Sequence, residues 1–285
     1  MPEPRAHEAH LADLDRHGCY ELCVQSPRHV AAFLRAVHGN HPVILREDFC
    51  GTAALSKRWL EDAARLGEKG GAVGVDLDRE CIRRASVEKP VGLELMVADC
   101  RGSQTPSNAT PVPQSDACDV VFVGNFSIGY LHTRLELLSY LRLCRDRLAR
   151  GGGGFGGGVF VCDIYGGASA YKLGSMTRKH PSRTGEMIHY HWAHESADPL
   201  TGMVTNSISF KVERDGEIVQ EMSRAFTYHW RLWPLAELRE AMLEAGFATT
   251  EVYTDCNIAP GETPVAVTDS ANLKDDWIVL VAARL

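Results

Sequence analysis

Three acidic residues, Glu47, Asp76 and Asp99, stand at or near the end of an apolar run of the chain. The runs cover residues 43–45, 72–75 and 93–98, and they are rich in valine, leucine and alanine. Short runs of this kind are typical of buried strands. If the strands are parallel, their carboxyl ends meet at one edge of a sheet, where ligands bind. The three carboxylates could then accept hydrogen bonds from the donor groups of one ligand.

The first run continues through a tight turn into a helix-forming stretch, and Gly51 allows the backbone to turn there. A dinucleotide site needs three glycines at such a turn, so that the backbone can approach the pyrophosphate and the helix can pack closely. Phe49 and Ala53 occupy the other two places. The turn therefore favours a ligand without phosphate and disfavours a nicotinamide dinucleotide.

Glu47, two intervening residues and then Cys50-Gly51-Thr52-Ala53 resemble the first motif of the class I S-adenosylmethionine (SAM) methyltransferases. An ordinary strand-to-helix turn is the alternative for this motif taken alone. In the family, the acid that matches Asp76 binds the ribose hydroxyls, and the acid that matches Asp99 binds the adenine amino group. Asp78 competes for the ribose, but its place before the next helix fits an N-cap better.

A fourth apolar run, residues 119–123, leads into Asn125-Phe126-Ser127-Ile128-Gly129-Tyr130. This segment resembles the loop of small-molecule N-methyltransferases that act on amino sugars and glycine, and it lacks the Asn-Pro-Pro-aromatic sequence of many nucleobase and glutamine methyltransferases. Alternatively, Asn125 and Ser127 only cap the following helix. The residues at positions 20–25 resemble a segment that folds over the cofactor in related enzymes, with Tyr20 as the candidate contact.

The resemblance implies an α/β fold: a Rossmann-like, seven-stranded class I methyltransferase sheet with an inserted antiparallel β lid. We expect an N-terminal helical cap at 1–42, a SAM-binding core at 43–163 and 234–285, and a substrate lid at 164–233, in a single structural domain overall. SAM is the implied cofactor. The expected cofactor-binding residues are Tyr20, Arg46, Glu47, Phe49, Cys50, Gly51, Thr52, Ala53, Asp76, Leu77, Asp99, Cys100, Asn125, Phe126 and Ser127.

The lid should contain three strands, at residues 187–192, 204–212 and 223–230, with turns at Asp198-Pro199 and Asp215-Gly216. The aromatic side chains of the lid either line a pocket or fill the core beneath the sheet. For any one of these side chains, a place in the core is favoured. If the acceptor is an amine, a neutral imidazole or a carboxylate could remove its proton. The candidates for a catalytic role are Tyr165, His191 and His229, and those for acceptor binding are Tyr130, Tyr165, Tyr190, Trp192 and Arg231.

Two further segments draw attention by composition. The basic segment consists of Lys172, Arg178, Lys179, His180 and Arg183; it could bind a carboxylate or phosphate, although a solvated loop is favoured. The glycine-rich run at 151–158 lacks the Lys-Ser/Thr of a phosphate-binding loop and precedes a strand, so a flexible insertion is expected.

The chain has 285 residues and a formal net charge of −7, which argues against the basic surface that nucleic-acid binding usually requires. Nine cysteines, an odd number without repeated spacing, indicate reduced thiols. Cys19 and Cys23 lie one helical turn apart near His7, His10 and His17, but no spacing resembles a zinc module, so no metal is expected. Without an apolar run long enough to span a bilayer or a signal-peptide core, we expect a cytoplasmic protein without membrane contact.

Together these patterns predict a SAM-dependent methyltransferase that acts on a small-molecule acceptor, with nitrogen favoured over oxygen. An O-methyltransferase and an RNA methyltransferase are the alternatives within the class, and a noncatalytic SAM-binding regulatory protein is the alternative from another class. No nucleic-acid partner is expected, and a homodimer is left open. The sequence does not select the acceptor.

Overall fold

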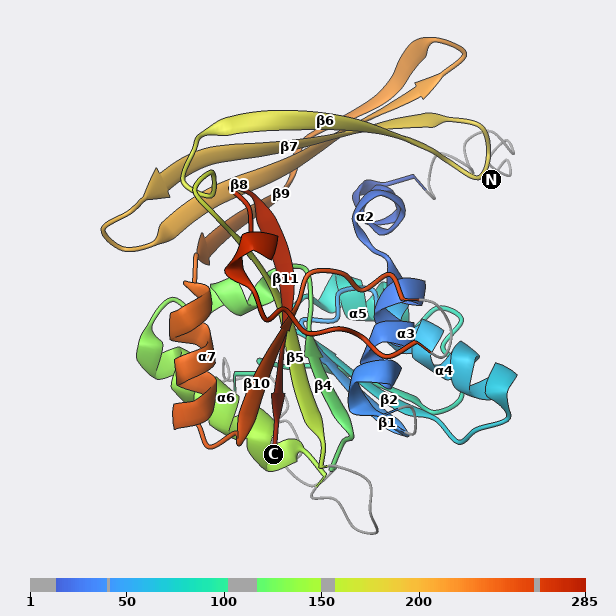
Figure 1. The fold of residues 1–285 in the computed structure, drawn as a ribbon. Coiled ribbons are helices and arrows are strands. Elements are labelled where there is room, and N and C mark those ends of the chain that lie inside the picture. The colour runs from blue at the N-terminus through green and yellow to red at the C-terminus, as the bar shows by residue number, and fades with distance from the viewer. Residues whose placement is uncertain (1–13, 40–41, 102–116, 150–156, 259–261) are drawn as a thin grey trace. The chain divides into compact units, whose positions relative to one another are not determined.

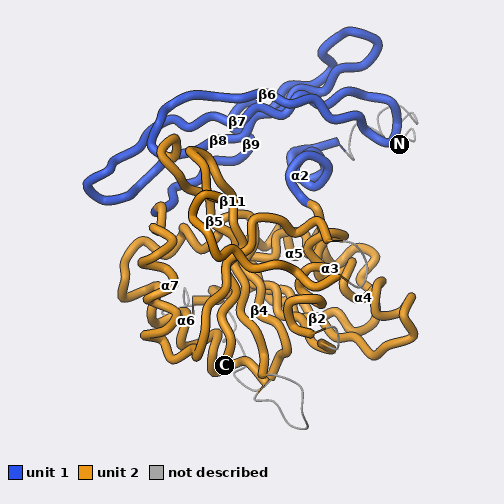
Figure 2. Tube along the Cα trace, viewed as in Figure 1, with its two compact units in different colours: residues 1–25, 171–231 blue, residues 26–170, 232–285 orange. Residues whose placement is uncertain are grey.

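The computed structural model describes residues 14–39, 42–101, 117–149, 157–258 and 262–285. Two compact units divide the chain (Figure 2). The lid unit comprises Met1–Gln25 and Tyr171–Arg231, and the core unit comprises Ser26–Ala170 and Leu232–Leu285. The division places the residues before Ser26 with the lid strands, whereas the expected N-terminal cap extended to residue 42.

A seven-stranded sheet forms the centre of the core unit, with the strand order β10-β11-β5-β4-β1-β2-β3. Only β11 runs antiparallel to its neighbours, β5 and β10, and all other pairs are parallel. The expected seven-stranded α/β sheet is therefore confirmed. Its strands are β1 (Ile44–Asp48), β2 (Gly71–Asp76), β3 (Leu93–Val97), β4 (Val120–Val123), β5 (Val159–Gly166), β10 (Thr249–Tyr253) and β11 (Trp277–Arg284).

Helices cover both faces of this sheet (Figure 1). On one face α6 (Arg134–Arg147) and α7 (Leu235–Glu244) pack against Val121 and Val123 of β4. On the other, α3 (Pro27–His38) and α4 (Ala54–Leu66) pack against Val120 and Phe122. Burial on both faces explains why the strands read as continuous apolar runs rather than as alternating patterns.

Local signals fix where the helices begin. Asp78 caps α5 (Arg79–Ala85) by accepting the amides of Glu80 and Cys81 at 2.8 and 3.4 Å. Thr133 and Glu136 form a reciprocal capping box at the start of α6. Two short 3₁₀ helices, η1 (Ser127–Tyr130) and η2 (Ser270–Asn272), complete the helical elements of the core unit that the structure describes.

The lid unit contains helix α2 (Arg16–Val24) and a four-stranded antiparallel sheet with the order β6-β7-β8-β9. The strands are β6 (Gly174–Pro181), β7 (Met187–Asp198), β8 (Met203–Arg214) and β9 (Glu217–Arg231). Asp215 and Gly216 both have positive φ, at 52° and 83°, as a two-residue type I′ hairpin requires. The antiparallel lid and both predicted turns are thus present.

One strand of the lid was not predicted. The basic segment was expected to be a solvated loop, but it contains β6, which pairs with β7 along its whole length. Its side chains are almost all exposed, so the sequence carries no apolar alternation to reveal the strand. Charged side chains on an edge strand also discourage pairing with another sheet.

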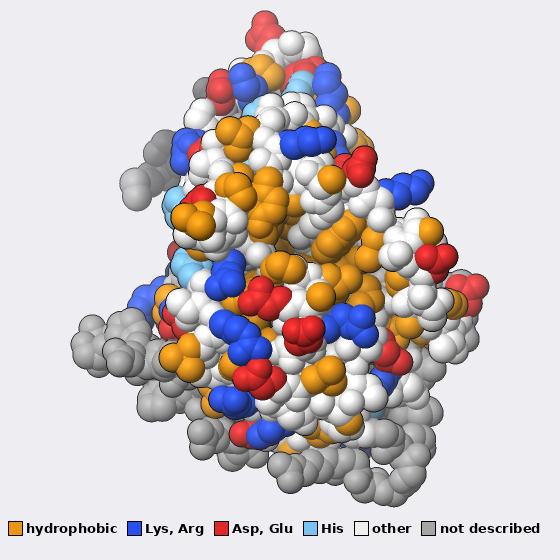
Figure 3. All heavy atoms as spheres, turned by 60° about the vertical axis from the view of Figure 1, so that its left-hand side comes forward, with side chains coloured by type: hydrophobic (Ala, Val, Ile, Leu, Met, Phe, Trp, Pro, Cys, Tyr) orange, Lys and Arg blue, Asp and Glu red, His pale blue; other side chains and the backbone are white. Residues whose placement is uncertain are grey.

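Charged side chains of both signs are interspersed over the face of the molecule in Figure 3. Ion pairs such as that of Arg134 with Glu244 join the neighbouring helices α6 and α7. All nine cysteines are free, and seven of them are buried. No described helix is long and apolar enough to cross a membrane, and the described residues contain no cluster of three or more potential metal ligands.

Candidate functional site

The carboxyl ends of the parallel strands β3, β2, β1, β4 and β5 meet at one edge of the core sheet. The predicted acids Glu47, Asp76 and Asp99 lie at this edge, as do the turn after β1 and the turn after β4. Carboxylates contributed by separate strands thus converge where an α/β sheet binds its ligand. We call this edge of the core unit the candidate site.

The turn after β1 has an unusual backbone. Phe49, Gly51 and Ala53 all adopt left-handed conformations, with φ values of 58°, 54° and 58°. A left-handed non-glycine residue costs about 1–2 kcal/mol, so the tertiary structure must hold Phe49 and Ala53 in place. The amide of Cys50 donates to the carbonyl of Val75 in β2 at 3.0 Å, which ties the turn to the sheet. A Cβ placed on Gly51 would meet nothing within 4 Å, so its backbone faces open space.

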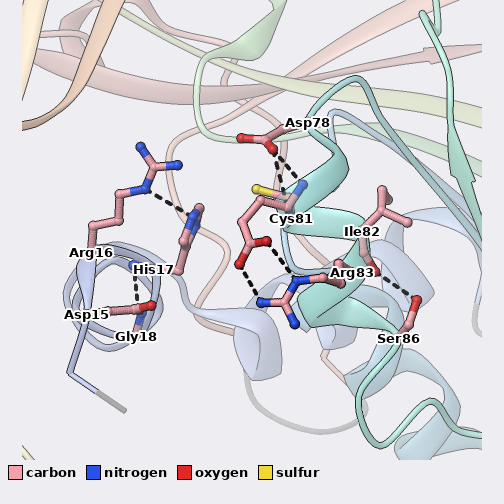
Figure 4. A network of polar contacts seen from close by, with 10 residues as sticks. Asp15, Arg16, His17, Gly18, Asp78, Cys81, Ile82, Arg83 and Ser86 are labelled. Atoms are coloured by element: carbon pink, nitrogen blue, oxygen red, sulfur yellow. Dashed lines mark hydrogen bonds and ion pairs between the residues drawn. The ribbon is translucent and has the colours of Figure 1, made fainter. Parts of the chain in front are cut away.

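Asp76 connects this turn to the end of β2. One carboxylate oxygen accepts the amide of Gly51 at 2.7 Å, and the other accepts the amide of Asp78 at 2.8 Å. Burial raises the pKa of Asp76, and these backbone hydrogen bonds oppose the rise. Because each carboxylate oxygen has two lone pairs, Asp76 can still accept hydrogen bonds from a ligand. Asp78 instead points to the first turn of α5 (Figure 4), which agrees with its predicted role as a helix cap.

Glu47 is buried, and its carboxylate accepts both the amide and the hydroxyl of Ser56 in α4, at 3.0 and 2.6 Å. Burial raises the pKa of Glu47 to about 7, against the lowering effect of the Ser56 hydrogen bonds. The carboxyl group therefore changes charge near neutral pH. Ser56 was not predicted from the sequence, because no local spacing marks a residue in the first turn of α4 as the partner of a strand acid.

Asp99 follows β3 and is held by Arg101. The guanidinium donates to both carboxylate oxygens at distances of 2.7 to 3.1 Å, and the Arg101 amide donates to one of them at 3.0 Å. Bidentate pairs of this kind fix the plane of a carboxylate. Arg101 was not among the predicted site residues, although an arginine two positions after a strand-end acid was visible in the sequence.

The turn after β4 brings together predicted and unpredicted residues. Asn125 and Phe126 are left-handed, with φ values of 55° and 61°, and both of their amides donate to Asp163 within the neighbouring strand β5. Burial raises the pKa of Asp163 to about 6. The Phe126 ring meets Tyr165 edge to face at 4.9 Å. The sequence had suggested Asp163 only as the end of a strand, without a role.

Two aromatic residues predicted for the site also meet. The ring of Phe49 stacks on that of Tyr130 from η1, with centroids 5.9 Å apart and planes inclined by 19°. Ser127 is buried at the start of η1. The predicted residues of the first turn and of the turn after β4 are therefore neighbours across the strands β1 and β4.

Arg46 lies elsewhere. Its side chain is buried beside Asp48, with the Arg46 Nε 2.9 Å from an Asp48 carboxylate oxygen. Tyr140 of α6 donates its hydroxyl to Asp48 at 2.8 Å, and Arg147 lies 3.6 Å from the same oxygen. Strand alternation places Arg46 and Asp48 on the face of the sheet opposite to Glu47. We call Arg46, Asp48, Tyr140 and Arg147 the buried ion network.

Three other predicted contacts differ in exposure. Cys100 is buried, and its carbonyl accepts a hydrogen bond from Arg147 at 3.4 Å. Thr52 is also buried, whereas Leu77 is exposed. Burial raises the pKa of the Cys100 thiol well above its usual value, so this sulfur stays protonated. Of the three, only Leu77 presents a largely accessible side chain.

The lid residues divide between the two faces of their sheet. Directly opposed residues share a face, so Trp192 of β7, Ile208 of β8 and Phe226 of β9 lie together. This aromatic face of the lid also carries Tyr190, Tyr228 and Trp230, with Tyr228 and Trp230 stacked at 4.4 Å. It packs against α2 of the same unit, where Tyr20 approaches Phe226 at 5.0 Å and His17 approaches it at 5.6 Å.

The predicted lid candidates do not form one group. Tyr190 is buried against Phe210 in the core of the lid unit, which raises the pKa of its hydroxyl to about 12. His191 and His229 belong to the opposite face, where they contact Thr177 and Thr205 at 3.0 and 3.3 Å. Arg231 follows on that face as the last residue of β9. His7 and His10 lie outside the described residues.

The sequence matches no model of a protein family and no curated protein. Solved structures do match. A SAM-dependent methyltransferase from Clostridium acetobutylicum is 16% identical, with a TM-score of 0.61 over 98% of this chain and 99% of that one. SAM-bound CalS10, an amino pentose methyltransferase from Micromonospora echinaspora, is 16% identical, with a TM-score of 0.63 over 100% and 99%. The sugar N-methyltransferase KedS8 from Streptoalloteichus is 14% identical, with a TM-score of 0.60 over 100% and 94%.

The three matches extend over nearly the whole of this chain and of each of those chains. At such low identity the likeness concerns the fold, and it agrees with the strand order, in which the last strand is inserted antiparallel beside the fifth. The chain therefore has the fold of the class I SAM-dependent methyltransferases.

Proposed function

We propose that this protein is an enzyme that transfers a methyl group from SAM to a nitrogen atom of a small molecule. The observation that carries the proposal is the convergence of Glu47, Asp76 and Asp99 at the edge where a class I fold binds its ligand. The turn after β1 supports it, because the backbone at Gly51 faces open space. The side chains of Phe49 and Ala53 stand where a dinucleotide site needs glycine.

The residues present suit an adenosine ligand. Asp76 has lone pairs left to accept the two ribose hydroxyls, and Asp99 can accept the adenine amino group while Arg101 fixes its orientation. Gly51, Asn125, Phe126 and Ser127 would line the rest of the cofactor site. When bound, SAM supplies an electrophilic methyl group on a sulfonium. The protein then has to align the acceptor with that methyl group and exclude water.

Nitrogen is the acceptor atom that we favour. The segment from Asn125 to Tyr130 resembles the corresponding loop of amino-sugar and glycine N-methyltransferases, and two of the matching structures carry the names of an amino pentose and a sugar N-methyltransferase. A protonated amine must lose a proton before its nitrogen can attack. Among the candidates for this role, Tyr165 contacts the turn after β4 through the ring of Phe126. His191 and His229 remain candidates from the lid unit.

Calorimetry with SAM, S-adenosylhomocysteine and NAD tests the cofactor assignment. We expect both adenosyl ligands to bind and NAD not to bind. Binding of NAD without binding of SAM would overturn the assignment. A screen of amines, amino sugars and hydroxyl compounds with mass detection of a 14 Da gain then tests turnover. Binding of SAM without any methylated product would favour a noncatalytic SAM-binding protein.

SAM binding should release a proton from Glu47. The folded-state pKa of this group is raised to about 7, so its charged form is disfavoured in the free protein and most populated above that pH. A cationic ligand favours the carboxylate, lowers the pKa and strengthens its own binding as the pH rises. Proton linkage then predicts an increase in affinity of about tenfold between pH 6 and pH 8, levelling off above.

Calorimetry in buffers of different ionisation enthalpy counts the released protons. Glu47→Gln is the control, because it keeps the shape of the side chain and cannot ionise, whereas the amino group of the ligand titrates equally in both proteins. The same pH dependence in the variant and in the parent protein would show that SAM binding does not change the protonation of Glu47.

Tyr165 of the core unit and Arg231 of the lid unit are the proposed contacts of the acceptor. We expect Tyr165→Phe and Arg231→Ala to lower kcat/KM about tenfold, as loss of one polar contact does, while SAM affinity stays nearly unchanged. Tyr190 is packed against Phe210, so Tyr190→Ala should lower the melting temperature, and Tyr190→Phe separates packing from the hydroxyl. A fall in SAM affinity that parallels the fall in activity would argue for a structural role of these residues.

A further inference from the structure

Asp163 is an acidic residue of β5 that the mechanism above does not use. Its two carboxylate oxygens each accept one backbone amide: that of Asn125 at 3.0 Å and that of Phe126 at 2.7 Å. The two donors are consecutive residues of the turn after β4. The Asp163 carboxylate therefore accepts hydrogen bonds from two adjacent backbone amides.

The conformation of this turn depends on such a partner. Asn125 and Phe126 both have positive φ, a backbone conformation that residues other than glycine rarely adopt. In this conformation the amides of Asn125 and Phe126 both point toward one anionic group, as successive amides do in anion-binding turns. That anionic group is the carboxylate of Asp163. Two further hydrogen bonds, from Ser127 to Gly124 and from Gly129 to Phe126, continue the turn into η1.

Strand β5 also contacts the turn after β4 through the ring of Tyr165. Tyr165, two residues beyond Asp163, meets Phe126 edge to face at 4.9 Å. Residues two apart on a strand point to the same side, so β5 presents a charged and an aromatic group to one short segment. Strand β5 therefore contacts both the backbone of the turn after β4 and the Phe126 side chain.

We propose that Asp163 is a positioning residue that holds the Asn125–Phe126 turn in the conformation that binds the cofactor. The proposal rests on the proposed function for the identity of that ligand, SAM. The statement that Asp163 holds the turn concerns the ligand-free protein and does not depend on which ligand binds. Asp163 acts here through the backbone of its neighbours and not on the reacting atoms.

Asp119 provides a matched control within the same sheet. Its carboxylate also accepts two consecutive backbone amides, those of Val43 and Ile44, at 2.7 and 2.8 Å. Both aspartates are half-buried. Asp119 precedes β4 and accepts amides at the start of β1, at the edge of the sheet opposite to the candidate site. The variants Asp163→Asn and Asp119→Asn each remove the negative charge and replace one acceptor oxygen with an NH2 group, which weakens the amide hydrogen bonds at opposite ends of the strands.

The experiment measures amide hydrogen exchange in the ligand-free variants at pH 7.5, above the pKa of about 6 of Asp163. We expect Asp163→Asn to speed exchange at Asn125 and Phe126 about tenfold, and Asp119→Asn to do so only at Val43 and Ile44. SAM affinity, measured by calorimetry, should fall about tenfold in the first variant and stay within about twofold in the second.

Unchanged exchange at Asn125 and Phe126 in Asp163→Asn would overturn the proposal. So would an equal loss of SAM affinity in both variants, because general destabilisation would then explain it. If the parent protein binds no SAM, the proposed function fails, and the exchange rates still decide whether Asp163 holds the turn. Melting temperatures of both variants show that each remains folded during the measurements.

Discussion

Replacing Asp76 with alanine is expected to weaken SAM binding about 100-fold, because two charge-assisted hydrogen bonds to the ribose would be lost, at roughly 3 kcal/mol together. The structure adds a second reason. Asp76 also accepts the amide of Gly51, so its removal loosens the turn after β1 on which the ligand would rest. Both effects act in the same direction. Calorimetric titration of the purified variant with SAM measures their sum.

Asp78→Ala is the matched control for this prediction. Asp78 stands two residues further along and caps α5 through the amides of Glu80 and Cys81. Its loss should cost about 1 kcal/mol of folding stability, with little effect on SAM binding. Equal weakening in both variants, or a larger effect at Asp78, would transfer the ribose contact from Asp76 to Asp78.

Removal of one member of the buried ion network should lower the folding stability more than the breaking of any other ion pair described. Asp48 is fully buried, and Arg46 and Arg147 both approach it. Asp48→Ala would leave two buried guanidinium groups without their shared anion, and breaking a buried pair in this way costs about 3–5 kcal/mol. Denaturant titration of the variant and of the parent protein gives the difference in the free energy of unfolding.

Two variants sharpen this test. Glu80→Ala removes the exposed ion pair with Arg83 and should leave the free energy of unfolding nearly unchanged. The double variant Asp48→Ala/Arg147→Met should be more stable than Asp48→Ala alone, because one uncompensated charge is removed as well. The network would be energetically unimportant if Asp48→Ala cost no more than Glu80→Ala.

Much of the core unit could be predicted from the sequence, because its signals are local. An apolar run that ends in an acid marks each of the first three parallel strands, and the ends of parallel strands must share one edge. Asp78 before α5 and Asp215-Gly216 in the lid hairpin also act through their own neighbours in the chain. The acids of the candidate site therefore followed from residue types and spacing, and the fold class followed from the family resemblance that these residues carry.

The tertiary structure decided which groups those acids meet. Ser56 reaches Glu47 from α4, and Asp163 reaches the turn after β4 from the next strand. The spacing of these pairs in the chain carries no signal of their contact, since hydrogen bonds between elements depend on how helices and strands pack. The left-handed conformations of Phe49 and Phe126 are likewise imposed by the fold, because neither side chain favours them.

The lid shows the same division between local and tertiary information. Alternating residues and turn chemistry predicted its three apolar strands, whereas β6 was missed because its exposed, charged side chains resemble those of a loop. Which face of a strand is covered depends on what packs there, and only the structure shows that α2 covers the face with Tyr190 and leaves His191 on the other. Sequence determined the elements and their chemistry, and packing determined their partners.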